Sequence, residues 1–249
     1  ITGGDEITIL DEHFSQMLIK LDRLIRTNYV QELDRKKLEL KNLQLQINPH
    51  FLYNTLETIS SIAAVNKVFI IGDIAGKLGE IFRYSLGKNY GDFVSLKDEL
   101  THIENYIFIQ KMRYGDKLEV FYDVETETKS CLVPRFILQP IIENSILHGI
   151  APRANGGIIE IRTEICEGNL VIRIEDDGVG MDAEKADYIN YVINSKRTES
   201  DENSGVGVKN VNQRIKFVYG DEYGVKLSSL LNQGSSCIIT IPAKNPEWD

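Results

Sequence analysis

The chain has 249 residues, of which 42% are hydrophobic and 26% charged, and its net charge at pH 7 is −9. These proportions are ordinary for a soluble globular protein with one large or two small domains. The 28 basic residues form no basic tract beside 37 acidic ones, which argues against a nucleic-acid partner because phosphate contacts need clustered Lys and Arg.

The cysteines favour a reducing cytosol and structural thiols as the default. Cys131, Cys166 and Cys237 are odd in number and lack the spacing of a zinc or redox site. The sequence contains neither a signal peptide nor an apolar run long enough to cross a membrane. It begins at Ile1 without a Met, so we expect it to be part of a longer protein.

The first 30 residues have the apolar spacing of a coiled coil. Intervals of four and three residues alternate along the series Leu10, Phe14, Met17, Leu21 and Leu24. The pattern continues, opposite a charged face, for about forty residues, which favours a coiled coil over one amphipathic helix packed on its own domain.

One histidine follows a proline in the middle of the next apolar series. We expect a single helix from about residue 32 to 64, with Pro49 and His50 inside it. An interior proline removes a helical hydrogen bond and kinks the helix, which would push His50 outward. The alternative is a plain break between two core helices.

A second helix is expected from about Val68 to Leu86, followed by Gly87 and Gly91. The two helices would form an antiparallel hairpin whose apolar faces need a partner. Pairing with a second copy would complete a four-helix bundle, so we expect a homodimer.

The rest of the chain has a mixed pattern. A third helix, capped by Ser95, is expected to reach about Tyr114 and to join the hairpin to the next domain. Residues 181–204 are polar and poorly periodic. The other expected elements are strands at 118–124, 157–165, 170–176, 225–230 and 236–241, and helices at 134–149 and 207–219.

This order of elements predicts an α/β sandwich in which helices cover one face of a mixed sheet. The expected domains are a coiled coil at 1–30, a helical hairpin at 31–92, a connecting helix at 93–116 and the α/β sandwich at 117–249.

An asparagine and a histidine share one face of the helix expected at 134–149. Asn144 and His148 are four residues apart, whereas Ile142 and Ile146 would face the core. An amide oxygen suits Mg²⁺, which keeps waters and bridges substrate phosphates. The alternative is that Asn144 contacts only solvent.

Two glycine-rich stretches flank the polar segment. Asp176-Asp177-Gly178-Val179-Gly180 follows a strand, and its glycines let the backbone approach a ligand, although the same letters can form a simple turn. Gly205-Val206-Gly207-Val208-Lys209-Asn210 opens a helix, whose N-terminal N–H groups can bind phosphate. Arg214 either reaches an anion there or is an exposed helix arginine. Between the two stretches, Ser200–Ser204 has the composition of a mobile lid.

These stretches resemble the motifs of one family. Gln46-Ile47-Asn48-Pro49-His50-Phe51-Leu52-Tyr53-Asn54-Thr55-Leu56 resembles the phosphoacceptor motif of LytS/YesM-type sensor histidine kinases. The stretches at Asn144, Asp176 and Gly205 resemble the N, G1 and G2 boxes of their GHKL-type ATP-binding domain. Gly4-Asp5-Glu6-Ile7 with its helix resembles the second half of a HAMP domain. The resemblance covers nearly the whole chain.

The resemblance implies a fold of class α + α/β: a coiled coil and helical hairpin in a dimeric four-helix bundle, followed by a GHKL (Bergerat) α/β sandwich that binds ATP. Asn144 then matches the Mg²⁺ position, Glu143 and His148 match its polar neighbours, and Asp176 accepts a hydrogen bond from adenine. The remaining nucleotide-binding positions would be Gly178, Gly180, Gly205, Gly207, Asn210 and Arg214.

The implied reaction is transfer of the γ-phosphoryl group of ATP to His50, and from there to an aspartate of a cytoplasmic response regulator. Imidazole is largely neutral at pH 7, as the attack requires. Many histidine kinases carry an acidic residue directly after the histidine, but Phe51 stands there. Asn54, one turn on, or Glu143, from the ATP domain, could act on the ring instead. The whole protein would be anchored in a bacterial cell membrane by helices outside this sequence.

Two alternatives differ in class. The first is an ATP-hydrolysing GHKL machine, which would need a Glu four residues before the metal-binding Asn, where this chain has Pro140. The second is a dimeric signalling scaffold with little catalytic activity, against which the three intact boxes argue.

Overall fold

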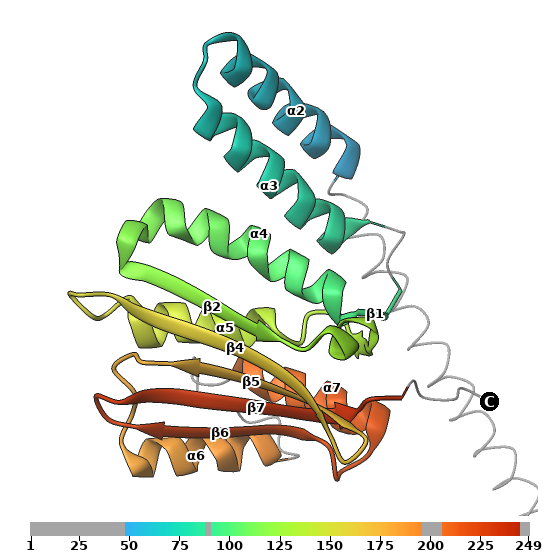
Figure 1. Ribbon diagram of the computed structural model, residues 1–249, viewed down its shortest axis with the longest axis vertical. Coiled ribbons are helices and arrows are strands. Elements are labelled where there is room, and N and C mark those ends of the chain that lie inside the picture. Colours follow the sequence, from blue (N-terminus) through green and yellow to red (C-terminus); the bar gives the residue numbers. More distant parts are fainter. Residues whose placement is uncertain (1–47, 88–90, 196–205, 245–249) are drawn as a thin grey trace, which may run out of the picture. The chain divides into compact units, whose positions relative to one another are not determined.

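The computed structural model describes residues 48–87, 91–195 and 206–244 (Figure 1). The chain divides into two compact units, Ile1–Phe51 and Leu52–Asp249. The coiled coil and HAMP-like segment expected at 1–30 lie outside the described residues. So do Gly205 and the stretch Ser200–Ser204 that the sequence assigns to a lid.

The helix that carries the histidine, α2, begins at Pro49 and ends at Val65. Asn48 is not helical, and its Oδ1 accepts hydrogen bonds from the backbone N–H groups of His50 (3.1 Å) and Phe51 (3.3 Å). Asparagine is a favoured helix cap, and proline suits the first helical position because its missing N–H would be unpaired there. The expectation of one continuous helix kinked at Pro49 is therefore wrong, because Pro49 starts the helix.

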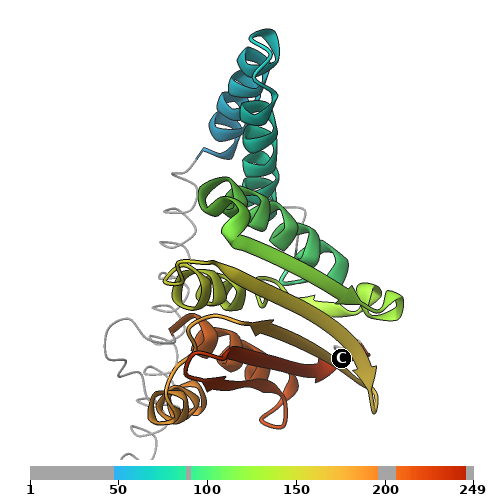
Figure 2. The same cartoon turned by 60° about the vertical axis from the view of Figure 1, so that its left-hand side comes forward.

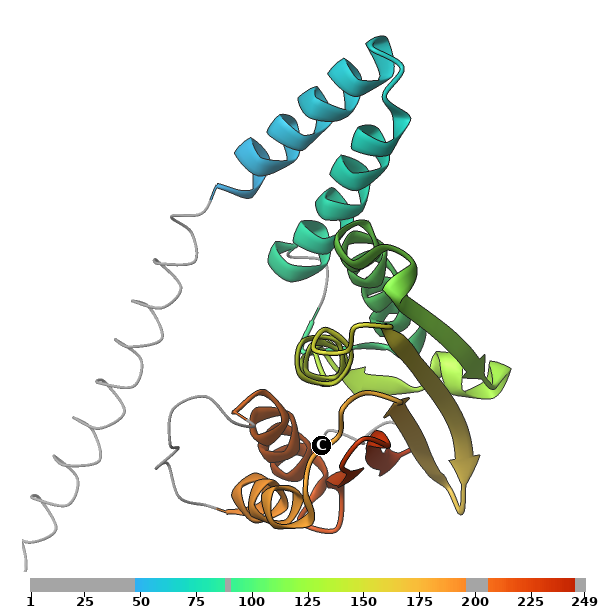
Figure 3. The same cartoon turned by 90° about the vertical axis from the view of Figure 1, so that its left-hand side faces the viewer.

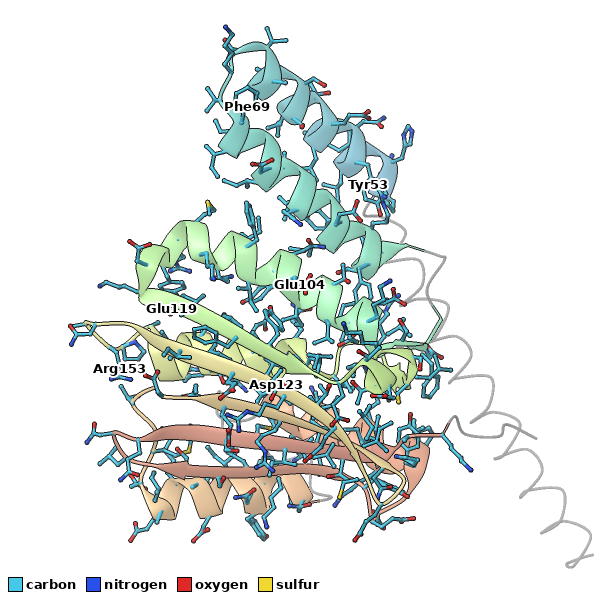
Figure 4. All side chains as sticks on the ribbon, in the orientation of Figure 1. Tyr53, Phe69, Glu104, Glu119, Asp123 and Arg153 are labelled. Carbon is cyan, nitrogen blue, oxygen red and sulfur yellow. The ribbon has the colours of Figure 1, made fainter. Side chains whose placement is uncertain are left out.

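The second helix of the hairpin, α3, spans Phe69–Leu86, as predicted. Few hairpin side chains are buried, namely Ala63 on α2 and Ala75 and Tyr84 on α3. Large apolar side chains of the hairpin are instead exposed, among them Phe69 at the start of α3 (Figure 4). The others include Ile59, Ile62, Val65, Ile70 and Ile71.

Helix α4, Leu96–Tyr114, also forms as predicted. Ser95 caps it: Ser95 Oγ accepts a hydrogen bond from the Asp98 N–H (3.1 Å) and donates one to Asp98 Oδ2 (2.6 Å). Its apolar side belongs to the same hydrophobic core as the sheet. Before α4, strand β1 (Phe93–Ser95) pairs antiparallel with β3 (Leu132–Pro134), a small sheet that the sequence pattern did not predict.

The main sheet has five strands in the order β2-β4-β5-β7-β6 (Figure 1). Only the β2–β4 pair is parallel, so the predicted mixed sheet is confirmed. Two short 3₁₀ turns, η1 (Gly115–Lys117) and η2 (Thr126–Ser130), flank β2. The strands are β2 Leu118–Val124, β4 Gly157–Cys166, β5 Asn169–Asp176, β6 Gly224–Leu230 and β7 Gly234–Pro242.

Helices cover one face of this sheet (Figures 2 and 3). They include α5 (Gln139–Asn144), which continues as the π-helical turn η3 (Ser145–Ile150), α6 (Ala183–Asn194) and α7 (Val206–Tyr219). Alternate residues of β5 are buried beneath them, as the period of two predicts. Among the described residues, no helix is both long and apolar enough to cross a membrane.

Two expectations for this layer are wrong. The helix expected from 134 begins only at Gln139, because Pro134 ends β3 and Phe136 has a φ of +62°, outside the helical region. Residues 183–194 form α6 instead of an unpatterned segment. Asp182 caps α6 by accepting the Lys185 N–H at 2.8 Å. Its buried residues are Ala186, Ile189 and Ile193.

Candidate functional site

A cavity of about 230 Å³ lies between the helical layer and the sheet. Apolar side chains make up much of its wall, and polar groups enter from α5, η3 and the end of β5. A small set of polar groups in a largely apolar cavity is typical of a site for an organic ligand. The lining includes Ile141, Asn144, Ser145, His148, Gly149, Ile174, Asp176, Val179, Gly180, Met181, Lys185, Ile189, Val208, Leu227, Ser235 and Cys237.

Asp176 supplies a buried acceptor to this cavity, with 8% of its surface exposed. Burial raises the pKa of its carboxyl group, and hydrogen bonds from Ser145, Gly178 and the Ser235 backbone partly oppose that rise. The Gly178 N–H donates to Asp176 Oδ1 at 3.0 Å. A carboxylate that is withdrawn from water and still accepts hydrogen bonds favours a ligand that offers an N–H donor.

The G1 glycines are required by contacts within the protein. A Cβ on Gly178 would lie 2.5 Å from the Gly149 Cα. Gly180 has a φ of +59°, and a Cβ there would clash with the carbonyl oxygen of Leu230. Both glycines therefore lie against neighbouring backbone, and Gly180 also lines the cavity, while close approach of a ligand to them stays a prediction.

The N-box helix consists of α5 and η3, and it points successive side chains in different directions. Asn144 and His148 both line the cavity, so the face that they were expected to share is present. Ile142 and Ile146 are buried, as predicted. Glu143 is not among the lining residues, and its Oε1 accepts a hydrogen bond from Gln139 Nε2 at 2.7 Å.

Helix α7 brings fewer of its expected residues to the cavity. Val208 lines it, and Gly207 lies against Pro140, where an added Cβ would be 3.2 Å from the proline Cβ. Asn210 and Arg214 are exposed, and Arg214 Nη1 donates to the Arg135 carbonyl oxygen at 2.5 Å. Nucleotide contacts by these residues stay predictions.

The histidine of the first motif lies in the first turn of α2. His50 and Asn54 are both exposed and are one helical turn apart. The backbone carbonyl of Asn54 accepts the Thr58 hydroxyl at 2.7 Å. The alternatives for the group that acts on the His50 ring, Asn54 and Glu143, both stay predictions.

Several cavity residues were missed by the sequence motifs. Ser145 and Gly149 lie within the N box but have no assigned role there. Lys185 and Ile189 come from α6, which the sequence pattern did not predict. Cys237 comes from β7, and burial together with the charge of Asp176 raises the pKa of its thiol to about 12. The spacing of Ala186, Ile189 and Ile193 was the available signal for α6.

Two family models match the chain. Residues 38–118 match the family described as "Histidine kinase". Residues 133–245 match the family described as "Histidine kinase-, DNA gyrase B-, and HSP90-like ATPase". The first region contains His50, and the second contains every residue that lines the cavity.

Relatives in bacteria match over most of this chain. Sensor histidine kinase YesM of Bacillus subtilis is 34% identical over 97% of the chain, and YpdA of Escherichia coli is 33% identical over 92%. Sensor protein LytS of Staphylococcus saprophyticus is 31% identical over 84%. The matched part is 40%, 38% and 34% of these relatives, so the chain spans well under half of their length. By both its domains and its relatives, the chain belongs to the LytS/YesM-type family of sensor histidine kinases.

Proposed function

We propose that this chain is the kinase portion of a two-component sensor and that it transfers the γ-phosphoryl group of ATP to His50. The observation that carries the proposal is the buried Asp176 carboxylate in an apolar cavity that also presents Asn144 and His148. An apolar slot with a buried acceptor suits a purine that carries an amino group. The match of residues 133–245 to the ATPase family supports ATP as that ligand.

The reaction would proceed by attack of the unprotonated ring nitrogen of His50 on the γ-phosphorus. An N–P bond forms, the bond to the bridging β–γ oxygen breaks, and ADP leaves. The proton on the other ring nitrogen must be lost for the phosphoimidazole to become neutral. Asn54 and Glu143 are the two groups proposed to orient the ring or receive that proton.

A magnesium ion fits the cavity as a partner of the nucleotide. Among the described residues, no three His, Cys, Asp or Glu side chains gather closely enough to hold a metal alone. The Asn144 amide oxygen would serve as the protein ligand, with waters and phosphate oxygens completing the shell, which is the usual arrangement for Mg²⁺. When bound, Mg²⁺ offsets charge that builds up on the phosphates.

The remaining steps are proposals that membership of the family supports. Phosphohistidine would pass its phosphoryl group to an aspartate of a cytoplasmic response regulator, and the hairpin would pair with that of a second copy. The exposed apolar residues of α2 and α3 support the pairing. We also propose that the whole protein is anchored in the membrane and that this portion works in the cytoplasm.

Incubation with γ-³²P-labelled ATP and Mg²⁺ tests the proposal. Label on the protein that is stable in base and lost in acid is expected, and His50→Gln should abolish it. Release of phosphate without label would instead support an ATP hydrolase. A chain that binds no nucleotide would support a scaffold.

A further inference from the structure

Two side chains of α4 hold the segment that leads into the N-box helix. Glu99 is fully buried, and its carboxylate accepts the backbone N–H groups of Phe136 (2.6 Å) and Leu138 (3.3 Å). Glu99 also accepts the hydroxyl of Tyr84 on α3. These bonds satisfy a buried carboxylate and fix the backbone immediately before Gln139, the first residue of α5.

A second set of bonds runs from α4 into α5 itself. His102 is 2% exposed, and its Nε2 lies 2.7 Å from Gln139 Oε1. Gln139 Nε2 donates to Glu143 Oε1, also at 2.7 Å. Since Gln139 directs its amide N–H to the carboxylate, its oxygen faces His102, so His102 Nε2 must carry the proton. The three side chains therefore form one directed chain of donors and acceptors.

The side chains around this series of hydrogen bonds restrict its movement. The ring of Tyr84 stacks on His102 with centroids 4.3 Å apart, and Phe136 meets both rings edge-on. Phe136 has a φ of +62°, a conformation that a bulky residue adopts only where its neighbours impose it. The contact between α4 and the start of α5 is thus defined by several independent interactions.

The hydrogen bonds from His102 through Gln139 to Glu143 affect the nucleotide site through the orientation of α5. Glu143 and Asn144 are consecutive, yet only Asn144 lines the cavity. The bond from Gln139 to Glu143 lies within α5 and orients the Gln139 amide, and the His102–Gln139 bond joins that amide to α4, so the two bonds together favour the rotation of α5 that turns Asn144 inward. We propose that His102, Gln139 and Glu143 form a positioning relay that fixes the N-box helix against α4 for binding of Mg²⁺–nucleotide. The relay gives Glu143 a positioning role in addition to the role toward His50 proposed above, and it rests on the proposed function because the ligand that it serves is Mg²⁺–nucleotide.

An exchange of two side chains tests the relay. Gln139→Glu keeps the shape but places two carboxylates face to face, and we expect it to weaken binding of Mg·ADP about tenfold. Adding Glu143→Gln to this variant leaves a carboxylate at position 139 and an amide at position 143. Both hydrogen bonds can then form again, with the donor and acceptor of the second bond exchanged. The double variant should bind Mg·ADP within about threefold of the unaltered chain by calorimetry.

Glu104→Gln is the matched control, because Glu104 is an exposed carboxylate on the same helix α4 (Figure 4). It should leave Mg·ADP binding unchanged. Circular dichroism reports folding, and loss of fold in Gln139→Glu that the second substitution repairs would also support the relay. Unchanged binding in the single variant, or no recovery in the double variant, would overturn it.

Autophosphorylation of the double variant separates the two roles of Glu143. Recovery of Mg·ADP affinity in the double variant supports the relay whatever its rate of labelling, because binding needs no transfer to His50. A rate that stays low at saturating ATP would then report the second role proposed for Glu143, toward the His50 ring. If the unaltered chain takes up no label, the proposed function fails, while the binding measurements still decide the relay.

Discussion

The nucleotide cavity and the α2–α3 hairpin differ in how much of their polar and apolar surface is paired or buried within one chain. Around the cavity, Asp176 is buried with three hydrogen-bonding partners, and the sheet beneath it has a closed apolar core. In the hairpin, Leu52–Leu86, three side chains are buried, while Ile62 and Phe69 are more than half exposed. The cavity is formed within one chain and would be filled by a ligand. The hairpin instead exposes apolar area that a second protein surface would cover.

The largest expected effect is on self-association through the hairpin. Replacing Ile59 and Ile62 by Asp places charge on exposed apolar positions that are one turn apart. Loss of apolar burial at each of the two positions should weaken dimerisation by a factor of roughly 10 to 100. Analytical ultracentrifugation measures the change. Thr58→Asp with Ser61→Asp, on neighbouring polar positions, is the control, and an equal loss there would contradict the apolar explanation.

The next effect concerns the cavity alone. Asp176→Asn keeps the shape but removes the charge that strengthens a hydrogen bond from an amino group. Binding of Mg·ADP should weaken about tenfold to a hundredfold. Asp187→Asn, on the exposed side of α6, should change nothing. Self-association of both variants should match the unaltered chain, because Asp176 and Asp187 lie in β5 and α6, outside the hairpin.

A smaller effect is expected from pH. Burial raises the pKa of Asp176, so in the folded protein this group favours folding most at low pH, and that contribution is lost as pH rises through the folded pKa. Ligand binding has the opposite sign, since the ionised form is the acceptor. Affinity for ADP should fall with decreasing pH, beginning above the ordinary Asp pKa of about 3.9.

Calorimetry of ADP binding as a function of pH measures this, with Asp176→Asn as the reference that keeps every titratable group except Asp176. A pH dependence of equal size in both proteins would show that Asp176 does not titrate at the site.

The smallest effect should come from the outer face of the sheet. Arg162 pairs there with Glu160 at 2.5 Å, but both side chains are substantially exposed. Exposed ion pairs contribute little because water and salt screen them. Arg162→Ala should leave the urea midpoint, nucleotide affinity and self-association unchanged. A clear loss of affinity would mean that this face takes part in binding.

Apolar periodicity predicted the elements whose burial is set locally, including α3, α4, α7 and the five strands of the main sheet. It missed α6, since three buried residues on an otherwise polar helix give a weak pattern. It placed the start of α5 too early, because Phe136 is held in a left-handed conformation by Glu99, 37 residues away. A proline can kink a helix or start one, and only the cap from Asn48 decides between the two.

The motifs predicted several residues that meet at the cavity, but not all of the residues that line it. Asn144, His148, Asp176 and Gly180 do line one cavity, as their motifs suggested. Lys185 and Cys237 could not be assigned, because their place depends on how α6 and β7 pack. The sequence also shows no link between His102 and Glu143, which are far apart in the chain and meet through Gln139.

The identity of the phosphorylated residue tests the account most directly. After incubation with ATP and Mg²⁺, the protein would be digested under alkaline conditions and its phosphopeptides sequenced by mass spectrometry. The account predicts phosphohistidine at His50 and none at His13, His102 or His148. Phosphate on any of those three, with position 50 unmodified, would contradict it.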